Sequence, residues 1–382
     1  MTVTLSPLHI DCDFDSGNIL VKDASDPARV CLAIRPDTRS EHFQWFHFKA
    51  AGLTPGQTHG FILENAGASS YHEAWSGYQA VASYDQQQWF RVPTRFDGKA
   101  LEFSLKAEQP QAWFAYFEPY PRARHNQLIE RATSLPGVEL LATGRSVEGR
   151  DIQLLRAGSG APGKRKLWII AQQHPGEHMA EWFMEGVIDR LQHNDPTIQA
   201  LLQEADLYLI PNMNPDGALH GHLRTNAKGQ DLNRACQDAS IDRSPEVLFA
   251  QQQMKLHGVD VFLDVHGDEE IPHVFTAGCE GNPGYTARIA ALEATFRDSL
   301  CKRTVDFQQV HGYPLSAPGQ ANMTLACNSV GQAFDCLSLT LEMPFKDHDD
   351  APNPQTGWNG LRSKDLASAV LDVFGQMAGT LR

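Results

Sequence analysis

Continuous apolar runs that alternate with helical segments constrain the fold of this chain most strongly. Four runs have the length of buried strands, and they lie at residues 166–172, 207–210, 259–265 and 338–341. Segments with helical character separate or follow them, at residues 124–133, 178–192, 244–257, 285–304 and 361–381. Strands that alternate with helices predict an α/β domain with a mixed, mostly parallel sheet flanked by helices.

The first 115 residues have a different pattern. Short apolar or aromatic runs recur there, at residues 30–34, 43–48, 60–63, 89–92, 101–105 and 112–117. Turn signals such as Thr54-Pro55-Gly56 and Asp97-Gly98 separate them, and several runs alternate apolar and polar residues. This spacing predicts an all-β sandwich. The Pro-containing stretch 118–122 is a plausible joint, so we expect a β-sandwich domain at 1–115 and a catalytic domain at 116–382.

Composition narrows the classes of function. The chain of 382 residues has 32 basic and 46 acidic residues, a net charge of −14, which argues against binding to nucleic acid or to an anionic membrane. The acidic N-terminus does not resemble a signal peptide, and no window is apolar enough for a membrane span. The seven cysteines are scattered without a CxxC pair, so we expect reduced thiols in a cytoplasmic protein.

Two strand ends carry residues that suit a metal ion. His174-Pro175-Gly176-Glu177 follows the apolar run 166–172 directly, and His266 follows the run 259–265. Two imidazoles and a carboxylate are suitable ligands for one Zn²⁺ and leave a fourth position for water, as in catalytic zinc sites. A surface histidine, or a buried histidine that only forms hydrogen bonds, is the alternative for each residue taken alone.

A third strand end carries Glu342, which stands between apolar neighbours in Leu339-Thr340-Leu341-Glu342-Met343. A carboxylate in such a place must be paired or functional. Beside a zinc-bound water Glu342 would act as general base, and a salt bridge to an arginine is the alternative.

The stretch from Pro211 to Arg234 is long and polar, and we expect it to be a loop rather than a helix. It contains Arg224 and Arg234. One guanidinium could stabilise an oxyanion and the other could bind a carboxylate through two parallel bonds. Taken without context, both arginines would be solvated surface charges.

These motifs occur together in an order that resembles a known family. HPGE at 174–177, NPDG at 214–217, DLNR at 231–234, His266 and TLEMPF at 340–345 resemble the zinc metallocarboxypeptidases. The similarity is greatest to the cytosolic carboxypeptidase subfamily of the carboxypeptidase A-like family. Residues 44–46 and 89–92 also resemble the β-sandwich of that subfamily, so the resemblance spans nearly the whole chain.

The resemblance implies a role for each matching residue. It implies one Zn²⁺ per chain held by His174, Glu177 and His266, with Glu342 as the general base that activates a zinc-bound water. It also implies substrate-contacting and supporting residues, namely Arg224 at the scissile carbonyl, Asn233 and Arg234 at the terminal carboxylate, and Asp231 behind His174. Tyr313 is a candidate for the mobile tyrosine of the family, whereas His178 has no family role and is expected at the surface or as a helix cap.

The implied activity is hydrolysis of the C-terminal peptide bond of peptide or protein tails, with a preference for acidic (glutamate) C-termini as a finer expectation. One alternative is a zinc amidohydrolase of the aspartoacylase or succinylglutamate desuccinylase kind that acts on N-acyl amino acids. A second alternative is a non-catalytic binding module with a structural zinc. The sequence decides neither the physiological substrate nor the oligomeric state.

Overall fold

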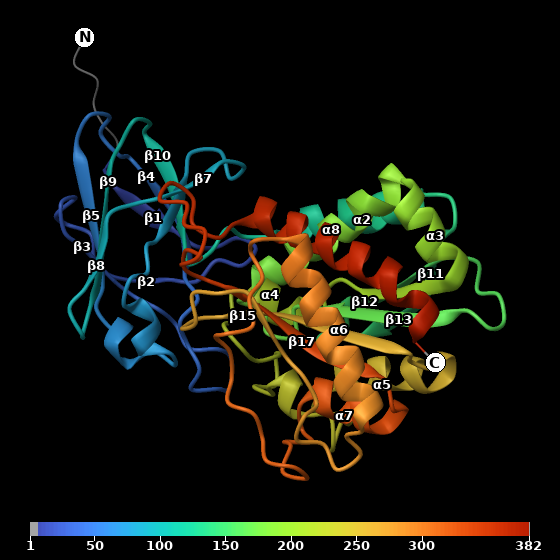
Figure 1. Cartoon of the computed structure of the whole chain (residues 1–382). Helices are drawn as coiled ribbons and strands as arrows, with labels where there is room; N and C mark the ends of the chain where they lie inside the picture. Colours follow the sequence, from blue (N-terminus) through green and yellow to red (C-terminus); the bar gives the residue numbers. More distant parts are fainter. Residues whose placement is uncertain (1–6, 382) are drawn as a thin grey trace.

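The computed structural model describes residues 7–381, and its N-terminal part is all-β (Figure 1). One five-stranded sheet has the order β1 (His9–Asp11), β4 (His47–Ala51), β10 (Gln111–Ala115), β6 (Val81–Ser83) and β7 (Trp89–Arg91). The second has the order β2 (Leu20–Asp23), β3 (Val30–Ala33), β5 (Thr58–Leu63), β9 (Leu101–Lys106) and β8 (Thr94–Phe96). Phe114 of the first sheet contacts Phe61 of the second, with ring centroids 4.6 Å apart. This aromatic layer between the sheets confirms the expected all-β domain.

The second part is an α/β domain around one seven-stranded sheet. The strand order is β11 (Val138–Arg145), β12 (Asp151–Ala157), β14 (Ala205–Ile210), β13 (Arg165–Ala171), β15 (Val261–Asp268), β17 (Leu337–Pro344) and β16 (Phe275–Ala277). The four strands from β14 to β17 in this order are parallel, and the strands at both edges are antiparallel. The expected mixed, mostly parallel sheet is therefore confirmed.

Helices cover both faces of this sheet, which explains why its central strands are apolar throughout. Within β13, Leu167 and Ile169 belong to one buried cluster, whereas Trp168 and Ile170 belong to the other. The first cluster includes residues of α2 (His178–His193), α3 (Pro196–Glu204), α6 (Ala287–Arg303) and α8 (Gly360–Met377), and the second includes residues of α5 (Pro245–His257) and α7 (Ala326–Phe334). No helix in the described range 7–381 is long and apolar enough to cross a membrane.

Strand register determines where the polar strand ends lie. Ala171 of β13 pairs with Val265 of β15, and His266 of β15 lies directly opposite Glu342 of β17. Because all three strands run in the same direction, the residues that follow them meet at one edge of the sheet.

Some local expectations were wrong. The stretch 211–234 contains the short helix α4 (Pro215–His220), which begins at Pro215 after Asn214, whose side chain accepts a hydrogen bond from the backbone N–H of Gly217. Pro at the first helical position and an asparagine cap are strong helix-start signals. Only residues 47–48 of the expected strand 43–48 belong to β4, and the hairpin of β11 and β12 was missed.

A buried carboxylate binds the segment that joins the two parts of the chain to the helices behind it. Glu185 of α2 accepts hydrogen bonds from Arg124 of α1 (Arg122–Thr133) at 2.6 and 2.8 Å, from the Tyr120 hydroxyl at 2.8 Å and from Lys364 at 3.2 Å. Burial alone would raise its pKa, but the hydrogen bonds and charge of Arg124, with Tyr120 and Lys364, hold the pKa of Glu185 at about 2.

This pKa predicts an acid-dependent loss of stability. A depressed carboxylate pKa stabilises the fold fully above the ordinary value of 4.5, and the contribution is lost as the pH falls from 4.5 toward 2. Glu185→Gln should therefore lower the free energy of unfolding by about 2 kcal/mol at pH 7. Urea unfolding of both proteins from pH 7 to pH 2.5 measures the difference, which should shrink only below pH 4.5. A difference that is constant across this range would contradict the assignment.

Candidate metal and catalytic site

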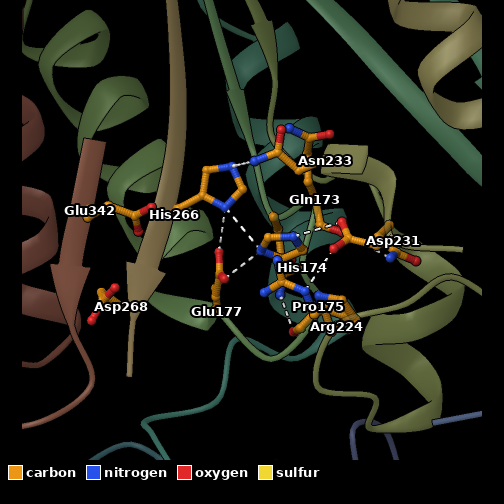
Figure 2. A network of polar contacts seen from close by, with 12 residues as sticks. Gln173, His174, Pro175, Glu177, Arg224, Asp231, Asn233, His266, Asp268 and Glu342 are labelled. Carbon is orange, nitrogen blue, oxygen red and sulfur yellow. Dashed lines mark hydrogen bonds and ion pairs between the residues drawn. The ribbon is translucent and has the colours of Figure 1, made fainter. Parts of the chain in front are cut away.

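Three side chains from two strand ends converge on one point (Figure 2). His174 and Glu177 lie in the turn between β13 and α2, and His266 lies in β15. His174 Nδ1 is 2.6 Å from Glu177 Oε1, His266 Nδ1 is 2.8 Å from Glu177 Oε2, and the two Nδ1 atoms are 3.2 Å apart. All three residues are buried. Two imidazole nitrogens and a carboxylate that face one point form a ligand set that fits Zn²⁺.

The far nitrogen of each histidine faces a carboxylate. His174 Nε2 is 3.1 Å from Asp231 Oδ1, and His266 Nε2 is 3.0 Å from Asp264 Oδ2. Each carboxylate can accept the Nε2 proton, which leaves the Nδ1 lone pair free for a metal. Asp264 is fully buried and also accepts a hydrogen bond from Gln173 Nε2 at 2.7 Å. Sequence reasoning missed Asp264, although an acid inside the apolar run 259–265 is a readable signal.

We expect the replacement Asp264→Asn to weaken zinc binding by roughly 10–100-fold, the range typical of lost support behind a metal-bound histidine. The amide keeps the shape of the side chain but can donate a proton toward His266 and so favour the wrong tautomer. Titration of the metal-free proteins with zinc, in competition with a chelating dye, measures the change directly. Asp242→Asn, at an exposed position, is the matched control. Equal zinc affinity in the two variants would show that Asp264 does not orient His266.

Residues 211–217 support the turn that carries His174 and Glu177 through side-chain hydrogen bonds. Asn214 Nδ2 donates to the carbonyl oxygen of Gln173 at 3.0 Å, and Asn212 Nδ2 donates to Gln172 Oε1 at 2.6 Å. Gln172 has φ +56°, in the left-handed region, and its side chain donates to the carbonyl oxygen of Pro175. These bonds stabilise an unfavourable backbone conformation that turns the chain sharply at the end of β13.

Glu342 lies beside the three converging side chains. Its Oε1 is 3.1 Å from the hydroxyl of Tyr313, and its Oε2 has no hydrogen-bond partner in the described part of the chain. Burial, together with the nearby charges of Glu177 and Asp268, raises the pKa of Glu342 well above its ordinary value, and His266 opposes this. The Tyr313 hydroxyl is also 2.6 Å from Asp268 Oδ2. Tyr313 therefore reaches the site from the loop between α6 and α7.

A cavity of about 400 Å³ opens beside these groups. Arg224 lines it and donates from Nε to Asp231 Oδ2 at 2.7 Å, with its guanidinium 5.7 Å from the ring centroid of Tyr71. Asn233 accepts a hydrogen bond from the backbone N–H of Ala326 at 2.8 Å. Arg234 is exposed, and no carboxylate of residues 7–381 lies within ion-pair distance of it.

Two further residues of the cavity had no sequence signal. Tyr71 belongs to the N-terminal domain, so both domains line the cavity, and Glu269 follows the expected metal ligand His266 by three residues. The expectation for His178 was wrong. Its ring is buried and lies 4.3 Å from the ring of Trp45, and its Nδ1 accepts the backbone N–H of Tyr120.

Comparison with known proteins identifies relatives of both domains. The family model described as cytosolic carboxypeptidase N-terminal domain matches residues 10–117, and the model described as zinc carboxypeptidase matches residues 125–257. The chain is 63% identical to a metallo-carboxypeptidase from Pseudomonas aeruginosa, solved in complex with (2-guanidinoethylmercapto)succinic acid, over 98% of this chain and 100% of that one, with a TM-score of 0.96. It is 42% identical to a metallo-carboxypeptidase from Burkholderia cenocepacia over 98% and 100% of the two chains, with a TM-score of 0.95.

A more distant relative is named a cytosolic carboxypeptidase. Cytosolic carboxypeptidase 6 of Caenorhabditis elegans is 25% identical over 88% of this chain and 79% of its own length. The match to the zinc carboxypeptidase model ends at residue 257, before His266 and Glu342. The side-chain distances place His266 beside His174 and Glu177, and the register of β15 and β17 places Glu342 opposite His266.

Proposed function

The chain belongs to the zinc carboxypeptidase family, with the N-terminal domain of the cytosolic carboxypeptidases, and on this premise we propose that it binds one Zn²⁺ through His174, Glu177 and His266. When bound, zinc supplies a Lewis acid and lowers the pKa of a bound water. The carboxylates of Asp231 and Asp264 hold the two imidazoles in the tautomer that a metal requires.

Glu342 is the proposed general base. The observation that carries this proposal is the register of β15 and β17, because it sets Glu342 directly opposite His266 at the same sheet edge. An unpartnered, buried Oε2 atom is free to take a proton from the attacking water and to deliver it to the nitrogen of the leaving amino acid. The Tyr313 hydroxyl, at 3.1 Å from Oε1, would steady the carboxylate during this transfer.

Arg224 and the pair Asn233–Arg234 are the proposed substrate contacts. Asp231 fixes Arg224 at the cavity wall, where its guanidinium can stabilise the negative charge that develops on the scissile carbonyl oxygen. Arg234 Nη1 donates to the carbonyl oxygen of Asn233 at 3.0 Å, but no carboxylate of residues 7–381 pairs with the guanidinium, whose remaining N–H groups can bind the terminal carboxylate of a peptide. Recognition of that group would make the enzyme an exopeptidase.

A preference for a C-terminal glutamate would need a cation for its side chain. Among the described residues that line the cavity, the only arginines or lysines are Arg224 and Arg234, and both have other proposed roles. The preference for a C-terminal glutamate therefore stays a prediction, and a library of peptides that differ in their last residue would test it. The succinic acid group of the ligand bound by the Pseudomonas aeruginosa relative suits the proposed carboxylate site, and we propose that this chain binds the same compound through Arg234.

Peptides with free and amidated C-termini, assayed beside N-acyl amino acids, test the function. We expect zinc-dependent release of the last residue from free peptides only. Arg234→Gln should raise KM for free peptides by roughly 10–100-fold, the effect of losing a charged hydrogen-bonded contact of about 1.5–3 kcal/mol, and should weaken inhibition by the succinic acid compound. Hydrolysis of N-acyl amino acids alone would favour the amidohydrolase instead.

A further inference from the structure

The side chains that line the cavity differ in chemistry. Ala277, Leu325 and Thr340 are neutral residues of this lining, and Leu325 precedes Ala326, whose backbone N–H donates to Asn233. Tyr71 of the N-terminal domain and the acidic run Asp268-Glu269-Glu270 also line the cavity, and burial together with the charge of Glu269 raises the pKa of the Tyr71 hydroxyl. A peptide whose last carboxylate is held at Arg234 and whose scissile carbonyl lies at Arg224 brings its preceding residue to the side of Arg224, which Tyr71 and Glu269 share.

Glu269 differs from the other buried carboxylates of the cavity. Glu177 contacts both histidines, Asp268 accepts hydrogen bonds from Tyr313 and from the backbone, and Glu342 contacts Tyr313. Glu269 is 7% exposed, and its own backbone N–H donates to its carboxylate, but no side chain of residues 7–381 donates a hydrogen bond to it or forms an ion pair with it. Burial without a partner is costly for a carboxylate, and a partner supplied by a ligand relieves that cost.

The residues around Glu269 do not supply this partner. Arg224 is a cavity cation whose charge acts on Glu269, but its Nε donates to Asp231 and its guanidinium faces the Tyr71 ring. Tyr71 adds an aromatic face to the same end, and such a face also attracts cations. Glu270, which is exposed, adds a second carboxylate at the rim.

We propose that Glu269, with Glu270 and Tyr71, forms a cation-binding subsite for the substrate residue that precedes the cleaved bond. The inference rests on the proposed carboxypeptidase function and names its substrate class: peptides with a positive group at that place. The group would be the side chain of a penultimate lysine or arginine, or the free α-amino group of a dipeptide. Glu269 is in this role a specificity-determining residue, which acts on substrate binding rather than on the proton transfer.

Three acetylated tripeptides that differ only in the penultimate residue test the proposal. They carry lysine, its neutral isostere norleucine, or glutamate, before the C-terminal residue that the wild type releases fastest. We expect kcat/KM to fall in the order lysine, norleucine, glutamate, with the lysine peptide at least roughly tenfold above the norleucine peptide. The difference should lie in KM and should decrease as the salt concentration rises. Comparison of a free dipeptide with its acetylated form shows whether the subsite binds the α-amino group of the substrate or a side chain.

Glu269→Gln keeps the size of the side chain and removes its charge, so it should bring the lysine-to-norleucine ratio to about one. Glu130→Gln, at an exposed position on α1, removes one negative charge elsewhere and should leave the ratio unchanged. Thermal unfolding and zinc content identify a variant that does not fold. Equal kcat/KM for lysine and norleucine in the wild type, or an unchanged ratio in Glu269→Gln, would overturn the subsite. Failure of the wild type to hydrolyse any of the peptides would instead refute the proposed function.

Discussion

Replacement of Glu342 by glutamine is expected to lower kcat for C-terminal hydrolysis by roughly 10²–10⁴-fold, the usual contribution of a general base. The glutamine amide keeps the shape of the side chain but cannot take a proton from water. Zinc content should not change, because Glu342 lies beside the three proposed ligands without being one of them. Single-turnover rates and metal analysis of the same preparation measure both quantities.

The matched control is Glu130→Gln, which makes the same chemical change at an exposed position of α1 and should keep wild-type kcat. Substrate affinity gives a second check, since a base that acts in the chemical step changes kcat more than KM. A Glu342→Gln enzyme with nearly the wild-type rate would refute the base assignment. Loss of zinc in that variant would show that Glu342 holds the metal.

Removal of the metal is expected to abolish hydrolysis while the protein stays folded. His266→Ala removes one of three proposed ligands, so we expect its zinc content to drop to a small fraction of one ion per chain and its activity to fall below detection. The fold should persist, because β13, β15 and β17 are buried along almost their whole length by apolar clusters on both faces of the sheet. Circular dichroism and metal analysis test the two statements separately.

The wild type stripped with a chelator provides the control. Added zinc should restore its activity and raise its melting temperature, since a ligand that binds only the native state stabilises it, whereas His266→Ala should gain neither. A stripped protein that unfolds would support a structural zinc. Activity that survives complete metal removal would refute the zinc mechanism altogether.

The sequence by itself determined the architecture. Continuous apolar runs such as 166–172 and 259–265 must be buried on both faces, which requires helices around a parallel sheet, and parallel strands bring their polar ends to one edge. The α/β class follows from these runs and the all-β class from the short runs of residues 1–115, whereas the family was indicated by the resemblance of motifs such as HPGE and TLEMPF. The meeting of His174, Glu177 and His266 at one point agrees with that expectation, while their roles in zinc binding stay predictions.

Only the tertiary structure decided which other groups surround the turn that carries His174 and Glu177. The short-range pattern of a sequence describes its own segment, whereas Tyr71 comes from the other domain, and Glu269 is identified by its burial without a side-chain partner among the described residues. Each of these facts depends on how distant segments pack together. Burial and partner geometry are properties of the assembled fold, and for that reason the charge of the substrate's penultimate residue could be proposed only from the structure.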